Sequence, residues 1–320
     1  MSGMEAVVQI EHLKKRFGKK VAIPDLTMEV YAGEVFGFLG PNGAGNTTTI
    51  KILTGLLQSD EGNVKICGYD LEKEFEKALT RVGAIVENPE LYSYMSGWSN
   101  LKMFARMRKG VTDERLKEIV ELVGLSNRIH EKVKKYSLGM RQRLGLAVTL
   151  MADPEVLILD EPTNGLDPAG IKHLRDILKE LAHRKNVCVI VSSHLMSEME
   201  LMCDRVGILS EGKLIQVQKI GAILETAQEE KIIYCYHVKE SSKVVSWLEK
   251  NYTLNAEKKD EEHFELSIDN TDQLIEINKN IILNGFSILT VCPKEKVSLE
   301  DVFLEMTEKG GDSIASLNEE

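Results

Sequence analysis

The chain has 320 residues, 43% of them hydrophobic, which is enough for one large and one small globular domain. Its formal net charge of −10 disfavours nucleic acid or an anionic lipid surface as the main partner. No apolar run approaches the roughly 18 residues that cross a bilayer, and residues 1–5 lack a charged-then-apolar signal segment. The five cysteines show no metal-binding spacing, as expected of reduced thiols. We therefore expect a cytoplasmic protein, with any membrane passage supplied by another polypeptide.

A glycine-rich loop between a predicted strand and a predicted helix is the first pattern that carries chemistry. Val35–Leu39 is a short apolar run typical of a buried parallel strand, and Thr48–Leu57 has helical apolar spacing. The loop between them follows the phosphate-binding pattern G-x-x-x-x-G-K-[ST], except that Asn46 stands in the place of the lysine. Glycines allow backbone N–H groups to surround a phosphate chain at the start of a helix. The predicted nucleotide ligands are Gly40, Pro41, Asn42, Gly43, Ala44, Gly45, Asn46, Thr47 and Thr48.

The next part of the chain is predicted to be mainly helical, over residues of about 88–150. Its helical runs include Asn100–Lys109 and Asp113–Val123. Ser137 is the predicted N-cap of a further helix over Leu138–Met151. Its hydroxyl, the backbone of Gly139 and the helix N-terminus form a candidate anion site, although capping alone explains a serine at this position.

Two carboxylates follow a buried strand in residues 151–218, where strands and helices alternate. The strand is Val156–Leu159, and Asp160 comes directly after it, where an acid can hold the shell of a Mg²⁺ ion together with the Thr47 hydroxyl. Glu161 lies one residue further and can orient or deprotonate an attacking water. His194 follows another apolar run, a position that is more often structural than catalytic.

A second, smaller domain is predicted beyond residue 218. Its pattern has the order β-α-β-β-α-β, which is the ferredoxin-like plan. We expect an accessory α+β domain over residues 219–308, with Ser298 capping a last helix, and a disordered tail over residues 309–320. The predicted elements are strand Lys231–Val238, helix Ser242–Lys250, strands Tyr252–Ala256 and His263–Ile268, helix Gln273–Leu283 and strand Ser287–Cys292.

Four segments, taken together and in order, resemble the ATP-binding subunits of ABC transporters. They are the glycine-rich loop, Tyr136–Arg143, Val156–Asp167 and Val191–His194, and the resemblance covers roughly residues 5–218. It implies a P-loop NTPase core of α/β class with an antiparallel β subdomain and a helical subdomain. It also implies an ATPase that uses ATP and Mg²⁺ and works as a homodimer beneath a separate membrane permease, on the inner face of the membrane.

The resemblance also implies roles for individual residues. Ser137 and Gly139 would reach across the dimer to the γ-phosphate held by the partner copy, although three positions of the family string Leu-Ser-Gly-Gly-Gln differ here. Asp167 matches the family's dimer-contact aspartate, His194 its switch histidine, and Phe17 the aromatic side chain that stacks on adenine.

One residue narrows the family further. Most ABC ATPases carry a glutamine after the strand that is Val82–Val86 here, and it joins Mg²⁺ to the transporter contact. This chain has Glu87, which resembles the branch that handles lantibiotics and bacitracin-type antibiotics. The loop from Glu87 to about Asn100 is the expected permease contact.

The resemblance thus implies the ATP-hydrolysing subunit of an ABC exporter for peptide antibiotics or similar amphiphiles. The sequence leaves two alternatives to this function. In the first, the chain binds nucleotide but hydrolyses it poorly, because Asn46 is neutral and shorter than the lysine of the pattern. In the second, the chain is an ABC ATPase that acts on ribosomes or DNA, against which its single cassette and acidic balance weigh.

Overall fold

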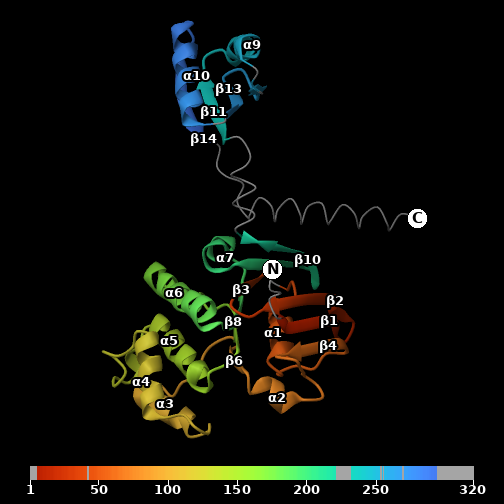
Figure 1. Ribbon diagram of the computed structural model, residues 1–320, viewed down its shortest axis with the longest axis vertical. Coiled ribbons are helices and arrows are strands. Elements are labelled where there is room, and N and C mark those ends of the chain that lie inside the picture. Colours follow the sequence, from red (N-terminus) through yellow and green to blue (C-terminus); the bar gives the residue numbers. More distant parts are fainter. Residues whose placement is uncertain are drawn as a thin grey trace, which may run out of the picture. The chain divides into compact units, whose positions relative to one another are not determined.

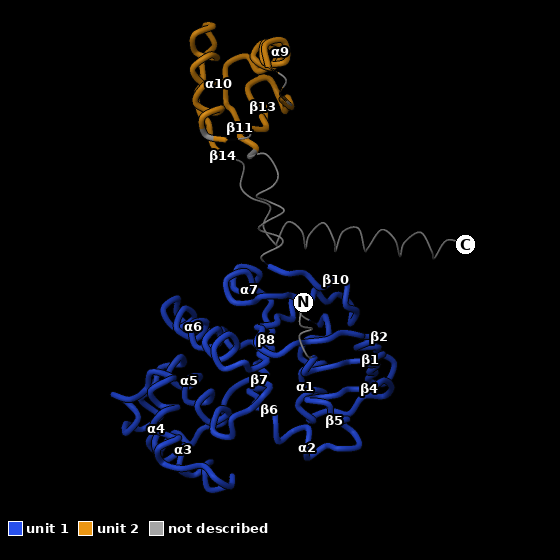
Figure 2. The backbone as a smooth tube through the Cα atoms, in the orientation of Figure 1, with its two compact units in different colours: residues 1–220, 307–320 blue, residues 221–306 orange. Residues whose placement is uncertain are grey.

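The computed structural model describes residues 6–41, 43–220, 232–252, 254, 256–268 and 270–293. The chain divides into two compact units, the first up to Ile220 and the second from Gly221 to Met306 (Figure 2). Each unit has its own hydrophobic core. The predicted Ser298 cap and the predicted tail lie outside the described residues.

The first unit is built on a ten-stranded sheet with the order β5-β4-β1-β2-β10-β9-β3-β8-β7-β6. The half of the sheet that contains β3 is parallel. Within it, β3 pairs in parallel with β8 and β9, and β7 pairs in parallel with β6 and β8. The outer half is antiparallel, with β1 between β2 and β4. The strands are β1 (Ala6–Phe17), β2 (Lys20–Tyr31), β3 (Val35–Leu39), β4 (Glu61–Ile66), β5 (Tyr69–Asp70), β6 (Val82–Ile85), β7 (Val156–Leu159), β8 (Cys188–Ser193), β9 (Arg205–Ser210) and β10 (Lys213–Lys219).

The helices of this unit fall into groups around the sheet. Figure 1 shows α3, α4 and α5 grouped apart from the antiparallel strands, and this group forms the predicted helical subdomain. Helices α6 and α7 pack against β3 and β8 instead. The helices are α1 (Asn46–Leu53), α2 (Phe75–Leu79), α3 (Gly97–Ala105), α4 (Asp113–Leu122), α5 (Leu138–Thr149), α6 (Pro168–Lys185) and α7 (Met196–Met202), with 3₁₀ turns η1 (Val133–Lys135) and η2 (Leu150–Ala152).

One predicted helix is displaced in the structure. The run Asn100–Lys109 was expected to be helical, but α3 is Gly97–Ala105. The helix begins early because the Ser96 hydroxyl accepts a hydrogen bond from the Ser99 N–H and so caps it. Asn100 is then inside the helix, where its side chain binds the Tyr92 and Ser96 carbonyls.

In its described residues, the second unit is a four-stranded antiparallel sheet with two helices. Its chain order is β11 (Ile232–Val238), α9 (Ser241–Asn251), β12 (Ala256–Lys258), β13 (His263–Ile268), α10 (Thr271–Leu283) and β14 (Ile288–Pro293), and the sheet order is β12-β13-β11-β14. The predicted strand Tyr252–Ala256 is wrong, because the pairing with β13 begins only at Ala256. Tyr252 instead caps α9 through its backbone N–H.

An ion pair between the buried Glu34 and the half-buried Arg205 joins the start of β3 to β9 in the first unit. The Glu34 side chain is 8% exposed, and its Oε1 accepts hydrogen bonds from the Arg205 guanidinium at 2.9 Å and the Tyr31 N–H at 2.8 Å. Burial raises the pKa of Glu34 above its usual value, although Tyr31 and Arg205 oppose this. The pair therefore positions the chain before β3 more than it stabilises the charge.

This geometry predicts different outcomes for two substitutions of Glu34. Glu34→Gln keeps the accepting oxygen and should change the free energy of unfolding by less than about 1 kcal/mol, whereas Glu34→Ala leaves the half-buried Arg205 without this acceptor and should cost about 3 kcal/mol. Urea unfolding would be followed by Trp98 fluorescence in a Trp247→Phe background, since the chain has two tryptophans.

The two forms should also differ in how their stability depends on pH. Because the pKa of Glu34 is raised in the folded state, the parent should gain stability relative to Glu34→Gln as the pH falls through that pKa, and lose it as the pH rises. Equal losses in Glu34→Gln and Glu34→Ala would contradict this account.

Candidate functional site

The glycine-rich loop has a backbone that admits little but glycine at two of its positions. Gly45 has a φ of +105°, and a Cβ there would lie 3.3–3.4 Å from Gly212 and the Ala22 carbonyl. At Gly40 a Cβ would lie 2.5 Å from the Leu209 carbonyl oxygen. The loop is held by the hairpin between β9 and β10, where the Gly212 N–H donates to the Ala44 carbonyl at 2.9 Å. The loop is therefore close-packed against β2 and this hairpin, while Asn42 lies outside the described residues.

Asn46 is turned back into this loop. The residue is 9% exposed, and its Nδ2 donates a long hydrogen bond of 3.4 Å to the Gly40 carbonyl. Its Oδ1 is buried without a hydrogen-bond partner among the described residues. A neutral amide with an unpaired oxygen cannot supply the positive charge that the phosphate-binding pattern places at this position.

A hollow of about 160 Å³ brings the loop together with two distant predicted residues. Phe17, at the end of β1, forms one side of it and is 50% exposed, as a stacking side chain must be. Glu161, which follows β7, forms another side. The structure thus places the predicted adenine contact, the phosphate loop and the predicted catalytic carboxylate around one space. The described lining residues are Phe17, Lys20, Ala22, Gly40, Pro41, Gly43, Ala44, Gly45, Asn46, Thr47, Thr48 and Glu161.

A hydrogen-bonded network connects the ends of β7 and β8 behind this hollow. Ser192 is 1% exposed; its hydroxyl donates to Asp160 Oδ1 at 2.6 Å and accepts from the Glu161 N–H at 2.8 Å. His194 Nδ1 lies 3.0 Å from Glu161 Oε2. The network holds Glu161 in a left-handed conformation with a φ of +48° and brings the predicted catalytic pair, Glu161 and His194, into direct contact.

Sequence reasoning did not single out Ser192. The signal was present, because two apolar strands each end in polar residues and the parallel pairing sets Leu159 opposite Val191. The next residues along, Asp160 and Ser192, must then be neighbours at the same edge of the sheet.

The residues suited to a metal ion are few. Thr47 lines the hollow with its hydroxyl-bearing side chain, and the buried carboxylate of Asp160, next to Glu161 in the chain, is the other oxygen ligand on offer. No cluster of three His, Cys, Asp or Glu side chains able to hold a metal occurs in the described part of the chain. Since Mg²⁺ is usually held by one or two protein ligands together with phosphate oxygens, this sparse donor set fits Mg²⁺ bound with a nucleotide.

Glu87 does not reach the hollow in this structure. Its carboxylate pairs with Lys51 of α1 at 3.0 Å, and its backbone has a φ of +66°. Its predicted role as a Mg²⁺ ligand therefore needs a different side-chain position from the one observed.

Ser137, Gly139 and Asp167 are not among the residues that line the hollow. The Ser137 hydroxyl caps α5 by accepting from the Met140 N–H, and the Asp167 carboxylate caps α6 by accepting from the Gly170 N–H at 3.0 Å. Ser137 is exposed, so the start of α5 is open to solvent. Within one copy of the chain, the start of α5 does not line the hollow that Phe17 and the loop form.

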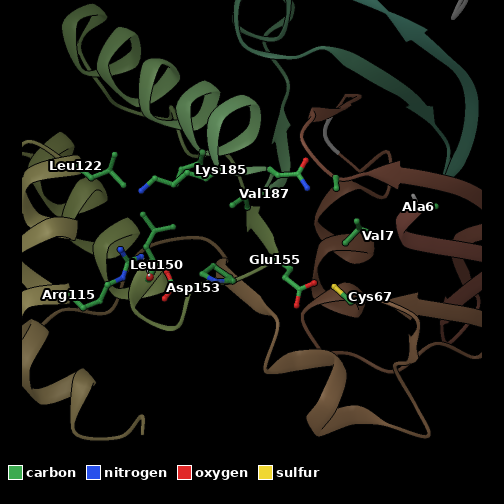
Figure 3. Close-up of a pocket in the computed structure, with 14 residues that line it drawn as sticks. Ala6, Val7, Cys67, Arg115, Leu122, Leu150, Asp153, Glu155, Lys185 and Val187 are labelled. Carbon is green, nitrogen blue, oxygen red and sulfur yellow. Dashed lines mark hydrogen bonds and ion pairs between the residues drawn. The ribbon is translucent and has the colours of Figure 1, made fainter. Parts of the chain in front are cut away.

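A larger hollow, of about 430 Å³, lies next to the beginnings of β7 and β8. Figure 3 shows Arg115, Leu150 and Asp153 on one side of it and Glu155, Val7 and Cys67 on the other. Arg115 and Asp153 form an ion pair within it. No predicted site residue lines this hollow, so its size does not make it the functional site.

Strand, glycine loop, helix and the acids after β7 together define an ATP-binding cassette. The chain belongs to the ABC transporter family, whose pattern its residues 23–164 match. No helix among the described residues is long and apolar enough to span a membrane.

Relatives cover nearly the whole chain. It is 50% identical to the ABC transporter ATP-binding protein YhcH of Bacillus subtilis, over 95% of this chain and 97% of the relative. It is 35% identical to the bacitracin transport ATP-binding protein BcrA of Bacillus licheniformis, over 97% and 100%. It is also 40% identical to the lantibiotic transport ATP-binding protein SrtF of Streptococcus pyogenes, over 65% and 89%.

Solved structures agree with this assignment. The structure of an ATP-binding subunit of an ABC transporter matches with a TM-score of 0.61 and 27% identity, over 69% of this chain and 92% of that one. A dimeric cassette, MJ0796, shares the fold with a TM-score of 0.60, over 67% and 98%. The predicted family, the predicted α/β fold and membership of a family of transport ATPases are confirmed.

Proposed function

We propose that this chain is the ATPase subunit of an exporter of peptide antibiotics or similar amphiphiles, acting through a separate membrane permease. The observation that carries the proposal is the single hollow shared by Phe17, the phosphate loop and Glu161. The substrate class is supported by the similarity to bacitracin and lantibiotic transport proteins, one of which matches along its full length. That similarity also weighs against an ABC ATPase of ribosomes or DNA.

Each copy provides half of a complete nucleotide site in this proposal. The hollow holds the adenine and phosphate contacts, while Ser137 is exposed and Gly139 half-buried at the start of α5, and neither lines the hollow of its own copy. A second copy in the opposite orientation would bring that helix N-terminus to the γ-phosphate, where its N–H groups favour negative charge. ATP then joins two copies, and its hydrolysis separates them.

The residues after β7 and β8 would perform the hydrolysis. Mg²⁺, when bound, neutralises phosphate charge, and Thr47 and Asp160 are the residues that would hold it. Glu161 orients the attacking water and accepts its proton. His194, 3.0 Å from Glu161, keeps that carboxylate in place. Ser192 fixes the backbone of Glu161 so that the carboxylate faces the hollow.

Asn46 supports a second, narrower proposal, that this copy binds ATP but hydrolyses it slowly. The backbone cradle and Thr47 are unchanged by the missing lysine, so ground-state binding persists. The transition state spreads more charge over the phosphoryl oxygens and loses more when a positioned cation is absent.

A groove suited to a permease lies between β6 and the helical subdomain. It has a volume of about 390 Å³ and is lined largely by apolar side chains, including Ile85, Leu91, Phe104 and Val148. Asn88 to Leu91 form its rim, inside the segment expected to contact the permease. Because Glu87 directly precedes this rim, a permease segment in the groove would be linked to the nucleotide site along β6. This chain would thus lie at the cytoplasmic face of the membrane.

The first prediction from this proposal concerns Asn46. Asn46→Lys should raise steady-state ATPase activity at saturating Mg-ATP by at least about ten-fold, equivalent to about 1.4 kcal/mol of transition-state stabilisation. Phosphate release would be measured for both forms, with ATP binding measured alongside.

A companion prediction concerns Glu161. Adding Glu161→Gln to the Asn46→Lys variant should nearly abolish ATP turnover and keep ATP binding. Equal rates for the parent and the Asn46→Lys variant would reject the slow-hydrolysis proposal, and high turnover without Glu161 would move the base elsewhere.

The second prediction concerns the dimer. Mg-ATP should increase dimer formation by the Asn46→Lys, Glu161→Gln chain in sedimentation velocity. Ser137→Arg should prevent this, because it places bulk and charge where the phosphate would lie. Ser242→Arg, on α9 of the second unit, is the matched control and should dimerise as the parent does. An oligomeric state that ignores both ATP and the Ser137 substitution would contradict the shared site.

The third prediction concerns the permease. Affinity capture of the tagged chain from solubilised membranes should recover a protein with several membrane spans. Leu91→Arg, in the groove, should abolish this recovery while ATP binding is kept. Leu201→Arg, an exposed position on α7 outside the groove, should not affect it. Recovery that is equal for both variants would show that the groove is not the docking site.

A further inference from the structure

The hollow at the phosphate loop contains one cationic side chain among its described lining residues, that of Lys20. We propose that Lys20 binds the phosphate chain of the nucleotide, at the end nearer the adenine, and is the main protein cation on it in this chain. The inference rests on the proposed nucleotide site and goes beyond it, since it assigns a ligand that the phosphate-binding pattern does not contain.

The placement of Lys20 follows from the hairpin between β1 and β2. Phe17 and Lys20 are directly opposed in the register, so their side chains leave the same face of the ribbon. Lys20 and Ala22 share that face because side chains alternate along a strand, and both line the hollow. Lys20 therefore stands beside the ring that would stack on adenine.

The distance to the loop is within the reach of a lysine. The Ala22 carbonyl packs against Gly45, since a Cβ at Gly45 would lie 3.4 Å from it. Lys20 is two residues earlier, about 6.6 Å along the strand, and its four-carbon stem spans nearly that length. Its ammonium can therefore lie over the space between Phe17 and the loop, where the first phosphates of a bound nucleotide pass.

Two lysines of the neighbouring elements β1 and α1 are already engaged with acids. Lys15 binds Asp60 at 2.7 Å, and Lys51 binds Glu87 at 3.0 Å. No ion pair joins Lys20 to an acidic side chain within the part of the chain that the structure describes. A phosphate that meets Lys20 need not displace a carboxylate first.

This position explains how binding and hydrolysis could be affected differently in one site. A cation at the adenine end attracts the phosphate chain of ATP and ADP alike. It is too far from the γ-phosphate to stabilise the charge that develops there during hydrolysis. Stabilising that charge is the role of the lysine for which Asn46 stands. Lys20 and a lysine restored at position 46 would then act on different phosphates, and their effects should add.

Calorimetric titration of the full chain with Mg-ATP and with Mg-ADP tests the inference. Lys20→Gln should weaken the binding of both nucleotides by about five-fold, an amount typical of an exposed charge-assisted contact. Lys19→Gln removes the same charge from the adjacent turn residue, which does not line the hollow, and should change neither affinity by more than about two-fold. Lys20→Arg should retain most of the binding. The same Lys20→Gln loss should recur in the Asn46→Lys background.

The outcomes separate the two proposals. If Lys20→Gln matches Lys19→Gln in either background while ATP still binds, the role of Lys20 is overturned and the nucleotide site stands. If only Asn46→Lys binds nucleotide, Lys20 is not an effective phosphate ligand and the inference is overturned. If neither background binds ATP or ADP, the proposed function fails and the Lys20 inference fails with it.

Discussion

The hydroxyl of Ser192 is the contact on which the candidate catalytic residues depend. It donates to Asp160 and accepts from the backbone of Glu161, so one buried group orients two consecutive acids with different tasks. An apolar residue there would leave the buried Asp160 carboxylate and the Glu161 N–H group without this partner, at a cost of about 1–3 kcal/mol for each. The parallel pairing of β7 and β8 brings the three residues together, so the sheet itself builds this part of the site.

The phosphate loop shows that shape and charge are separable in this fold. The tight contacts of Gly40 and Gly45 are satisfied with an asparagine at position 46, since the amide turns inward and bonds to the Gly40 carbonyl. The backbone donors that hold phosphates do not depend on that side chain. What the asparagine removes is a charge at one point, which matters most when the γ-phosphate is transferred.

The sequence was most informative where chemistry demands a fixed order of residues. The strand before the loop, the acids after Val156–Leu159 and the cap at Ser137 could all be predicted, because each rests on local spacing. The Ser192 network and the place of Lys20 could not be read from local patterns, since both arise from pairing between segments distant in the chain. The errors at α3 and β12 have the same origin: a cap and a cross-strand register outweighed local propensity.

Glu161 and Glu87 share a backbone feature with a consequence for how such a chain can change over generations. Both are non-glycine residues with positive φ, of +48° and +66°, a conformation that costs an ordinary side chain roughly 1–2 kcal/mol. Glycine at either position would relieve that strain and remove a carboxylate. Selection for thermal robustness alone would therefore favour loss of the two acids. At these two positions, therefore, backbone stability and the presence of an acid are opposed.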